Sequence, residues 1–373
     1  MSVGAAKPPA QADWFAVANP GLAGPVAKEW AALLPNVTLS TTDAGVEFVT
    51  SATQVRAALP WLRATTRLWR RLCTTKARAF GELERKWSAV SWADFVPAGH
   101  QLRVDVTIRH CRLYHSGAIK ERLAAAVAGH VILGTTTLAP EARLLVRGEN
   151  DEFQVSVDAS GERLNVRGYR QEVGRAPLRE TLAAGLLSLC GWRPGEALVD
   201  PMCGSGTIGI EAMLAAWGVP SGDRAFAMDA WPCFAAEVPR EPPQRGLPET
   251  PQLVLVADKD AVMVERARRN ATRAGVAHGM RFLAQGFETL APPSASGLLL
   301  FNPPYGHRLG AAAGMTKQFT GMARTLATSW RSWRGGVLLP KGAELRAAGL
   351  KLQQQWPLSN GGLPVVLSLY NID

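Results

Sequence analysis

Short runs of apolar residues alternate with amphipathic segments along the second half of the chain. Three runs are apolar almost throughout: 197–199, 253–257 and 297–301. Such runs are typical of parallel strands that are buried on both faces. The amphipathic segments 208–217 and 261–274 are followed by Gly218 and Gly275, and glycine commonly ends a helix. This alternation predicts a mostly parallel sheet with helices on both faces.

The first half of the chain gives a less regular pattern. We expect strands at 104–108 and 154–158, and a helix at 118–128. Pro177 suits the first position of a further helix, because its ring fixes a helical φ and an amide hydrogen would have no partner there. The segment 231–251 contains six prolines, which predicts a surface loop inserted before the strand at 253–257.

A basic segment lies in the first half of the chain, before the predicted strand at 104–108. From Arg56 to Lys86, nine lysines and arginines face only two acids. We interpret 60–73 as an amphipathic helix with an apolar face in the core, formed by Leu59, Leu62, Trp69 and Leu72. The opposite face would carry four arginines: Arg63, Arg67, Arg70 and Arg71. That face is either an ordinary solvated surface or a phosphate-binding stripe, and the lack of acids on it favours RNA.

The composition of the chain indicates a partner of opposite charge. The chain has 373 residues, enough for two or three domains, with a net charge of +10 and a pI near 9.7. This charge favours a polyanionic partner. The five cysteines are scattered without zinc-ligand spacing, which is typical of a reduced, cytoplasmic protein without a metal site. No apolar run has the length of a membrane span, and the first dozen residues lack the apolar core of a signal peptide.

The segment 200–207, Asp-Pro-Met-Cys-Gly-Ser-Gly-Thr, directly follows the first apolar run. Gly204 and Gly206 allow a tight turn and close approach to a ligand, and the amides of the following helix face the same point. A dinucleotide fingerprint or a phosphate-binding loop would need further glycines or a Gly-Lys-Ser/Thr sequence, and neither is present. Asp200 suits the ammonium of a methionine moiety better than a pyrophosphate. A tight turn without a ligand is the alternative.

A second acid follows the run 253–257. Asp258 is nearest to the predicted strand end, where an acid can bind vicinal ribose hydroxyls. Asp260 is better placed to cap the helix that follows.

The segment 302–306, Asn-Pro-Pro-Tyr-Gly, follows the third apolar run. The side-chain oxygen of Asn302 and the carbonyl of Pro303 can accept hydrogen bonds from the exocyclic amine of a base and free its lone pair for methylation. Tyr305 offers a surface for stacking, worth about 1–3 kcal/mol per base. Positioning of the two reactants then supplies most of the catalysis. The alternative is a Pro-Pro turn that only ends a strand.

These motifs resemble those of a known family. Residues 176–306 resemble the Asn-Pro-Pro-Tyr class of S-adenosylmethionine-dependent methyltransferases, and more narrowly the bacterial large-subunit ribosomal RNA guanine-N2 methyltransferase L family. Further family-like segments are 164–170, 176–184, 224–231 and 359–362. Upstream, the segment 14–22 resembles the start of a ferredoxin-like module, and 91–94 and 111–117 resemble the THUMP domain that follows such a module.

The resemblance implies a Rossmann-like α/β methyltransferase domain with seven strands, preceded by an α+β RNA-binding module. The last two strands would form an antiparallel hairpin, and 365–370 fits the final one. The implied divisions are a disordered tail 1–12, a ferredoxin-like domain 13–70, a THUMP domain 71–160, a linker 161–176 and a methyltransferase domain 177–373.

The resemblance also implies the site. The expected cofactor is S-adenosylmethionine, bound by Asp200, Pro201, Cys203, Gly204, Ser205, Gly206, Thr207, Asp258 and Gln285. The expected catalytic residues are Asn302, Pro303 and Tyr305, and the expected product is N2-methylguanosine in large-subunit ribosomal RNA. RNA contacts are expected from Arg63, Arg67, Arg70, Arg71, Arg109, Arg112 and Arg308 of a monomer.

Two departures from the family pattern affect the site. The family usually carries an acid after the third strand, near the adenine, where this chain has Gly286; Gln285 or a backbone amide would take over that contact. After the catalytic turn, His307 stands where the family tends to have glutamate, and we expect it to cap a helix.

Other functions remain open at this point. The same turn serves enzymes that methylate adenine N6 in DNA or a glutamine of release factors, but neither needs an N-terminal RNA module of this size. Transfer RNA is an alternative substrate, because fold and motif do not encode which RNA is bound. A non-catalytic RNA-binding assembly protein is a further alternative, against which the intact Asp200, Asp258 and Asn302 argue.

Overall fold

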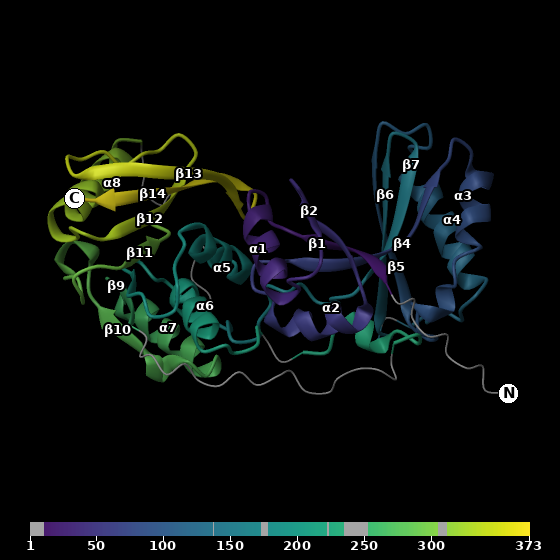
Figure 1. Cartoon of the computed structure of the whole chain (residues 1–373), viewed down its shortest axis with the longest axis horizontal. Helices are drawn as coiled ribbons and strands as arrows, with labels where there is room; N and C mark the ends of the chain where they lie inside the picture. The colour runs from purple at the N-terminus through teal and green to yellow at the C-terminus, as the bar shows by residue number, and fades with distance from the viewer. Residues whose placement is uncertain (1–10, 137, 173–177, 222–223, 235–252, 305–311) are drawn as a thin grey trace.

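The computed structural model describes the chain except residues 1–10, 137, 173–177, 222–223, 235–252 and 305–311. Its strands form two separate seven-stranded sheets, one in each half of the chain. Figure 1 shows an elongated molecule with the C-terminal sheet at one end, strands β5 to β7 at the other, and α1, α2 and β1 between them.

The N-terminal sheet has the order β2-β3-β1-β4-β7-β6-β5. Its strands are β1 (Ala12–Val17), β2 (Leu39–Thr42), β3 (Gly45–Thr50), β4 (Arg67–Lys76), β5 (Gln101–Arg109), β6 (Glu141–Glu149) and β7 (Glu152–Asp158). The helices of this half are α1 (Ala23–Leu33), α2 (Ala52–Ala58), α3 (Phe80–Trp87) and α4 (Ser116–Ala128), with the 3₁₀ turns η1 (Leu59–Trp61) and η2 (Trp92–Asp94).

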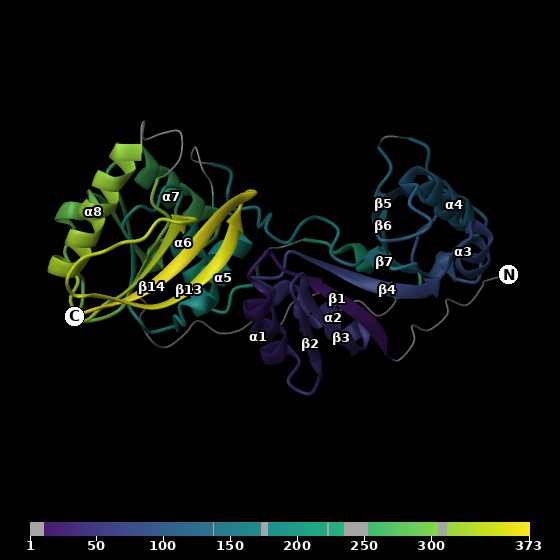
Figure 2. The same ribbon diagram turned by 90° about the horizontal axis from the view of Figure 1, so that it is seen from above.

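The first four strands have the predicted ferredoxin-like connection. The order of elements is β1-α1-β2-β3-α2-β4, and these strands lie in the order β2-β3-β1-β4. Strand β4 then pairs antiparallel with β7, while β5 and β6 form a parallel pair connected through α4. The expected boundary at 70/71 therefore falls inside β4, a strand that both halves of this sheet share (Figure 2).

The prediction of a helix at 60–73 is wrong. Only η1 is helical, and β4 begins at Arg67. The spacing of apolar residues fitted a helix, but Trp69 and Arg70 pair with β1 on one side and β7 on the other. A central strand is covered on both faces, so its side chains need not show the alternation of a half-exposed strand. The expected core residues Leu59, Leu62 and Trp69 are nevertheless buried.

The C-terminal sheet has the order β10-β9-β8-β11-β12-β14-β13. Its strands are β8 (Leu198–Asp200), β9 (Val254–Asp258), β10 (Met280–Ala284), β11 (Leu298–Phe301), β12 (Arg334–Pro340), β13 (Leu350–Asn360) and β14 (Leu363–Ile372). The helices are α5 (Glu180–Leu189), α6 (Thr207–Ala216), α7 (Ala261–Arg273) and α8 (Ala312–Ser329), with η3 (Ala227–Ala230), η4 (Ala277–Gly279) and η5 (Phe287–Thr289).

This sheet confirms the predicted methyltransferase architecture. The first five strands are parallel, β14 runs antiparallel to β12, and β13 and β14 form the expected antiparallel hairpin. The helices α6 and α7 end as predicted, because Gly218 and Gly275 adopt positive φ just beyond them. The expected helix start at Pro177 is wrong: α5 begins at Glu180, and Arg179 before it has an extended backbone with ψ of 145°. Pro177 itself lies outside the described residues.

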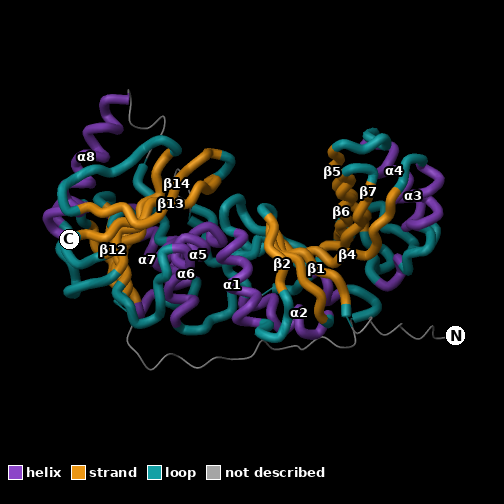
Figure 3. The backbone as a smooth tube through the Cα atoms, turned by 45° about the horizontal axis from the view of Figure 1, so that its top comes forward, coloured by secondary structure: helices purple, strands orange, loops and turns teal. Residues whose placement is uncertain are grey.

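The two halves pack closely against each other (Figure 3). A Cβ on Gly185 of α5 would lie 2.5 Å from Cδ1 of the buried Leu22, so a larger residue there would displace the Leu22 side chain. The prediction of a surface loop from 231 is wrong for its first residues. Trp231 and Phe234 are buried, and Trp231 stacks on Trp14 of β1 with centroids 6.3 Å apart. Residues 235–251 lie outside the described part of the chain.

Candidate active site

Neighbouring strands bring the two sequence motifs together. Strand β8 pairs in parallel with β9 on one side and with β11 on the other. The segment 201–206, which we call the glycine loop, therefore leaves the sheet beside the turn that begins at Asn302. Open parallel sheets bind ligands at this edge, outside the carboxyl ends of the strands.

The glycine loop is held by its own backbone and by β9. The Cys203 amide donates to the Ala257 carbonyl at 2.9 Å, and the Gly206 amide donates to the Cys203 carbonyl at 2.8 Å. Gly204 and Gly206 have φ of +51° and +83°, a region that favours glycine. A Cβ on Gly204 would meet no heavy atom within 4 Å, so this residue faces open space. The loop is preformed and leaves room for a ligand.

Asp200 is a buried carboxylate at the start of this loop. Its Oδ1 accepts a hydrogen bond from the Met202 amide at 3.2 Å, and no cation among the described residues forms an ion pair with it. Burial, with a smaller contribution from Asp258, raises the pKa of Asp200 well above its usual range. A cationic ligand would restore its charge. Burial also raises the pKa of the Cys203 thiol, which therefore is no activated nucleophile.

Asp258 is hydrogen-bonded to the glycine loop. Its Oδ2 accepts a hydrogen bond from the Gly204 amide at 3.1 Å, and its Oδ1 accepts one from the Asp260 amide at 3.0 Å. Asp260 caps α7, as predicted, by accepting from the Val262 amide at 2.9 Å. Asp258 thus lies at the ligand edge, but part of its hydrogen-bonding capacity already holds the glycine loop.

Gln285 lies on the other side of β9. Its amide donates to the Asp258 carbonyl at 3.0 Å, while its side-chain Nε2 donates to the Thr289 carbonyl at 2.7 Å. Nε2 also donates to the Thr289 hydroxyl at 3.3 Å, so both of its hydrogens are engaged and Oε1 remains for a ligand. The role of Gln285 in adenine recognition stays a prediction.

Asn302 is the most informative residue of the site. Its side-chain Oδ1 is buried and has no hydrogen-bond partner among the described residues. An unpaired buried acceptor costs about 1–3 kcal/mol, a cost that a ligand donating to it would offset. Pro303 is buried beside it, and Gln318 of α8 donates to the Pro304 carbonyl at 3.5 Å. The predicted site residues Tyr305 and Arg308, and also His307, lie outside the described residues.

The predicted arginine stripe is not a solvated face. Arg67 and Arg70 are at most 9% exposed. Arg67 forms an ion pair with Asp158, and Arg70 lies over Phe95 with its guanidinium carbon 4.6 Å from the ring centroid. Arg71, the remaining β4 member, pairs with Glu47.

Arg63 joins the two halves of the molecule. Its guanidinium donates to the carbonyls of Leu214, at 2.8 Å, and Val219, and it lies 3.8 Å from Glu211 of α6. Burial lowers the pKa of Arg63 to about 10. These contacts bind the N-terminal half to α6, the helix that follows the glycine loop. Because the other three arginines are also buried or paired, the four do not form a phosphate-binding stripe.

Arg109 and Arg112, by contrast, are exposed at the turn between β5 and α4. The Asn150 amide donates to the Arg109 carbonyl, and the Arg112 amide donates to Asp151, which places this turn beside the β6–β7 hairpin. Tyr114, 74% exposed, follows in the same turn.

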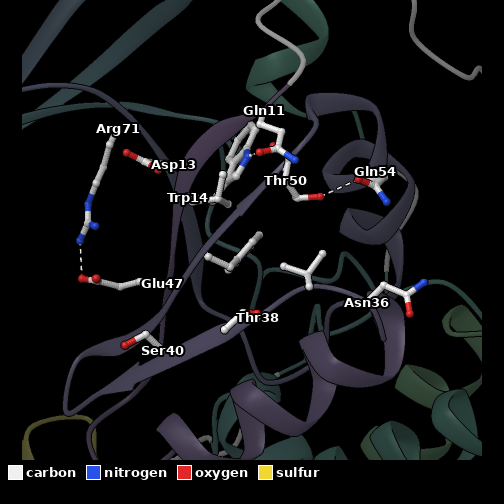
Figure 4. Close-up of a pocket in the computed structure, with 13 residues that line it drawn as sticks. Gln11, Asp13, Trp14, Asn36, Thr38, Ser40, Glu47, Thr50, Gln54 and Arg71 are labelled. Carbon is white, nitrogen blue, oxygen red and sulfur yellow. Dashed lines mark hydrogen bonds and ion pairs between the residues drawn. The ribbon is translucent and has the colours of Figure 1, made fainter.

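A pocket lies on the N-terminal sheet, away from these motifs (Figure 4). Residues of β1, β2 and β3 line it, and its charged lining residues are Asp13, Glu47 and Arg71, the last two paired with each other. Two acids against one cation do not favour a phosphate group. Among the described residues we find no group of three or more metal-ligating side chains and no helix long and apolar enough to cross a membrane.

Sequence reasoning missed a group of polar residues around the glycine loop. Four of them are buried, Arg167, Tyr169, Glu211 and Asn270, and Glu172 beside them is partly exposed. One signal was available. Asn270 occupies the buried face of α7 together with Val264 and Ala267, where an apolar residue is expected.

Comparisons with known proteins agree with this geometry. A candidate RNA methyltransferase of Synechocystis sp., slr0064, is 28% identical over 341 residues, which cover 88% of this chain and 89% of that protein. The ribosomal RNA large subunit methyltransferase K/L of Syntrophotalea carbinolica is 31% identical over 384 residues, 96% of this chain but 53% of that protein. The chain thus spans about half the length of the K/L relative.

The same likeness holds in three dimensions. The crystal structure of SMU.472, a candidate methyltransferase complexed with SAH, superposes with a TM-score of 0.86 and 26% identity, covering 98% of this chain and 99% of that one. Residues 167–363 match the family model described as UPF0020, RMKL-like, methyltransferase domain. Because this match covers more than half of the chain and contains both motifs of the site, the chain belongs to the family of RMKL-like methyltransferase domains (UPF0020).

Proposed function

We propose that the chain is an S-adenosylmethionine-dependent RNA methyltransferase that forms N2-methylguanosine, with large-subunit ribosomal RNA as its substrate. The observation that carries this proposal is the buried Oδ1 of Asn302, which has no partner in the part of the chain that the structure describes. It lies at the edge where the glycine loop leaves the sheet, so a base amine and a cofactor can meet there. The names of the K/L relative and of the SAH-bound neighbour support the substrate and the cofactor.

The described residues fit the cofactor. Gly204 faces open space, and the buried carboxylate of Asp200 suits a cationic methionine moiety. Asp258, at the end of β9, is placed for the ribose hydroxyls. When bound, S-adenosylmethionine supplies an electrophilic methyl group on a sulfonium.

The chain's own residues prepare the base. Asn302 Oδ1 and the Pro303 carbonyl accept hydrogen bonds from the exocyclic amine, which localises the nitrogen lone pair and directs it out of the ring plane. The amine loses its proton only after it is methylated, so no strong general base is needed. Tyr305 is proposed as the stacking surface. The target guanine must be out of its stack, as in a loop, bulge or flipped nucleotide.

The N-terminal half is proposed to bind the RNA. We assign 13–160 to a ferredoxin-like domain and a THUMP domain that share β4, 161–176 to a connection and 177–373 to the methyltransferase domain. Arg109 and Arg112 are the exposed cations of the N-terminal half that we assign to phosphate. In Figure 3 the β6–β7 hairpin beside them and the start of α8, which follows the catalytic turn, project toward the same side. A cytoplasmic location fits this substrate.

Transfer of a labelled methyl group tests the proposal. The purified chain is incubated with methyl-labelled S-adenosylmethionine and with unmodified large-subunit ribosomal RNA, transfer RNA or DNA, and the digested nucleosides are separated. We expect label in N2-methylguanosine from ribosomal RNA, and none with Asn302→Ala. Loss of one positioned hydrogen-bonding group typically costs about 10²–10³-fold in turnover. Label in transfer RNA would support the alternative substrate, and label in adenine would refute guanine as the target.

A further inference from the structure

The segment 167–172, which we call the belt, connects the N-terminal half to the catalytic sheet. At its start, the buried Arg167 guanidinium donates to the carbonyls of Leu62 at 3.2 Å and Arg63 at 2.6 Å. The Tyr169 hydroxyl donates to Glu211 of α6 at 3.0 Å, and Arg167 Nε lies 3.4 Å from the same carboxylate. The belt thus begins in a buried polar cluster between the two halves.

The end of the belt is clamped onto α7. Glu172 accepts hydrogen bonds from Arg269 through both carboxylate oxygens, at 2.7 and 2.6 Å, and from Arg273 at 2.9 Å. Hydrogen bonds from these two guanidinium groups lower the pKa of Glu172 to about 2. We call Glu172, Arg269 and Arg273 together the clamp. All three side chains are therefore charged throughout the neutral pH range.

Asn270 connects this clamp to the glycine loop. Its side chain is fully buried and makes four hydrogen bonds. Nδ2 donates to the carbonyls of Glu172 at 2.9 Å and of Ser205 at 3.1 Å. Oδ1 accepts from the Glu172 amide at 3.3 Å and from Arg273 at 3.0 Å. One side chain thereby links the belt, α7 and the glycine loop.

The bond to Ser205 fixes a peptide group in the middle of the glycine loop. The Ser205 carbonyl points to Asn270, while the next amide, that of Gly206, donates to the Cys203 carbonyl. Both sides of this peptide are therefore held, and the preceding amide of Gly204 is held by Asp258. A loop that binds a ligand through its backbone depends on such support, because a small displacement misplaces every contact.

We propose that Asn270 is a positioning residue for the cofactor: it holds the glycine loop in its binding geometry, with Glu172 supporting it from the belt. This inference rests on the proposed function, since it takes the loop as the S-adenosylmethionine site. An apolar residue would fill the same place on α7, and a buried amide is retained only at a cost unless its partners are all satisfied. All four bonds of Asn270 go to the belt, the loop or the clamp.

Two variants test this role. Asn270→Asp keeps size and the acceptor oxygen but cannot donate to Ser205 and Glu172. Glu172→Gln removes the charge of a residue near the surface, so it tests the support without a change in the core. Glu265→Gln is the matched control, because Glu265 lies on the same helix and contacts Arg268 and Arg269 only at 3.7 and 3.8 Å. Calorimetry with S-adenosylmethionine and steady-state kinetics with RNA are measured on the full chain.

We expect Asn270→Asp to bind S-adenosylmethionine about ten-fold more weakly, because it loses both hydrogen bonds that Nδ2 donates and the glycine loop is less well held in its binding geometry. Glu172→Gln should weaken binding about three-fold, because Glu172 supports Asn270 and does not contact the loop itself. In both variants the KM for the cofactor should rise, while kcat and the KM for RNA stay within about two-fold of those of the unaltered chain. The control should bind like the unaltered chain.

Unchanged cofactor affinity in both variants would overturn the proposal. So would a fall in kcat in proportion to the folded fraction with an unchanged KM for the cofactor, because that result indicates a purely structural role. If Asn270→Asp does not fold, Glu172→Gln decides. Failure of the unaltered chain to bind S-adenosylmethionine would refute the proposed function itself, and is thus distinguishable from failure of the positioning role alone.

Discussion

Gly204 and Gly206 adopt similar backbone conformations but have different surroundings, so the same substitution should affect them differently. A Cβ on Gly204 would project into open space, whereas one on Gly206 would lie 2.8 Å from the Cβ of Ala267 in α7. Ala267 is fully buried and cannot easily move. Gly204→Ala should therefore act on the ligand, and Gly206→Ala on the fold.

The magnitudes follow from these contacts. A left-handed backbone costs a residue with a Cβ about 1–2 kcal/mol, and this applies at both positions. At Gly206 the clash adds an overpacking cost of about 1–3 kcal/mol, so the total is about 2–5 kcal/mol. A destabilisation of 1 kcal/mol lowers Tm by about 2–4 °C in a domain of this size. Gly206→Ala should thus lower Tm by about 4–20 °C and Gly204→Ala by about 2–8 °C.

Thermal unfolding and calorimetry with S-adenosylmethionine, on the same preparations, separate the two effects. We expect Gly204→Ala to remain folded at room temperature and to lose most of its cofactor affinity, because the methyl group occupies the space proposed for the ligand. Normal cofactor affinity in folded Gly204→Ala would refute the placement of the cofactor over this loop. A Tm of Gly206→Ala equal to that of Gly204→Ala would refute the packing argument.

Three further predictions address the charged residues. Arg63→Glu should destabilise the fold by about 3–5 kcal/mol, because it breaks a buried charge cluster with Glu211; an unchanged Tm would contradict the observed interface. Asp258→Ala should weaken cofactor binding, whereas Asp260→Ala should only remove a helix cap, at about 0.5–2 kcal/mol of stability. Equal affinities in calorimetry would argue against Asp258 as a cofactor ligand. Because the pKa of Asp200 is raised in the folded chain, its protonated form favours folding at low pH, and this contribution is lost as pH rises through the raised pKa. A cationic cofactor that pairs with ionised Asp200 should reverse that loss, so cofactor affinity should rise with pH and binding should release a proton. Calorimetry in buffers of different ionisation enthalpy measures this release, and its absence would contradict the pairing of Asp200 with the cofactor.

The elements and motifs of the catalytic sheet could be predicted because their signals are local. Each motif follows a buried apolar run, and the topology of parallel sheets places such strand ends at one edge. Asp260 was identified as a cap for the same reason, since a cap needs only its own helix.

Features that depend on tertiary packing could not be predicted in the same way. The apolar spacing of β4 fitted a helix, and its arginines found partners that lie far away in sequence, such as Asp158 for Arg67. Asn270 connects residues 65 and 98 positions away, a link that only the packed α7 creates. Trp231 lay in a proline-rich segment typical of a surface loop, but it stacks on Trp14 of the other half.

The proposed formation of N2-methylguanosine in ribosomal RNA through Asn302 can be tested in cells. Nucleosides from a deletion strain are measured by mass spectrometry, with ribosomal and transfer RNA separated and the strain complemented by the unaltered chain or by Asn302→Ala. We expect N2-methylguanosine to fall in large-subunit ribosomal RNA, to return with the unaltered chain and not to return with Asn302→Ala. An unchanged level in the deletion strain, or full restoration by Asn302→Ala, would contradict it.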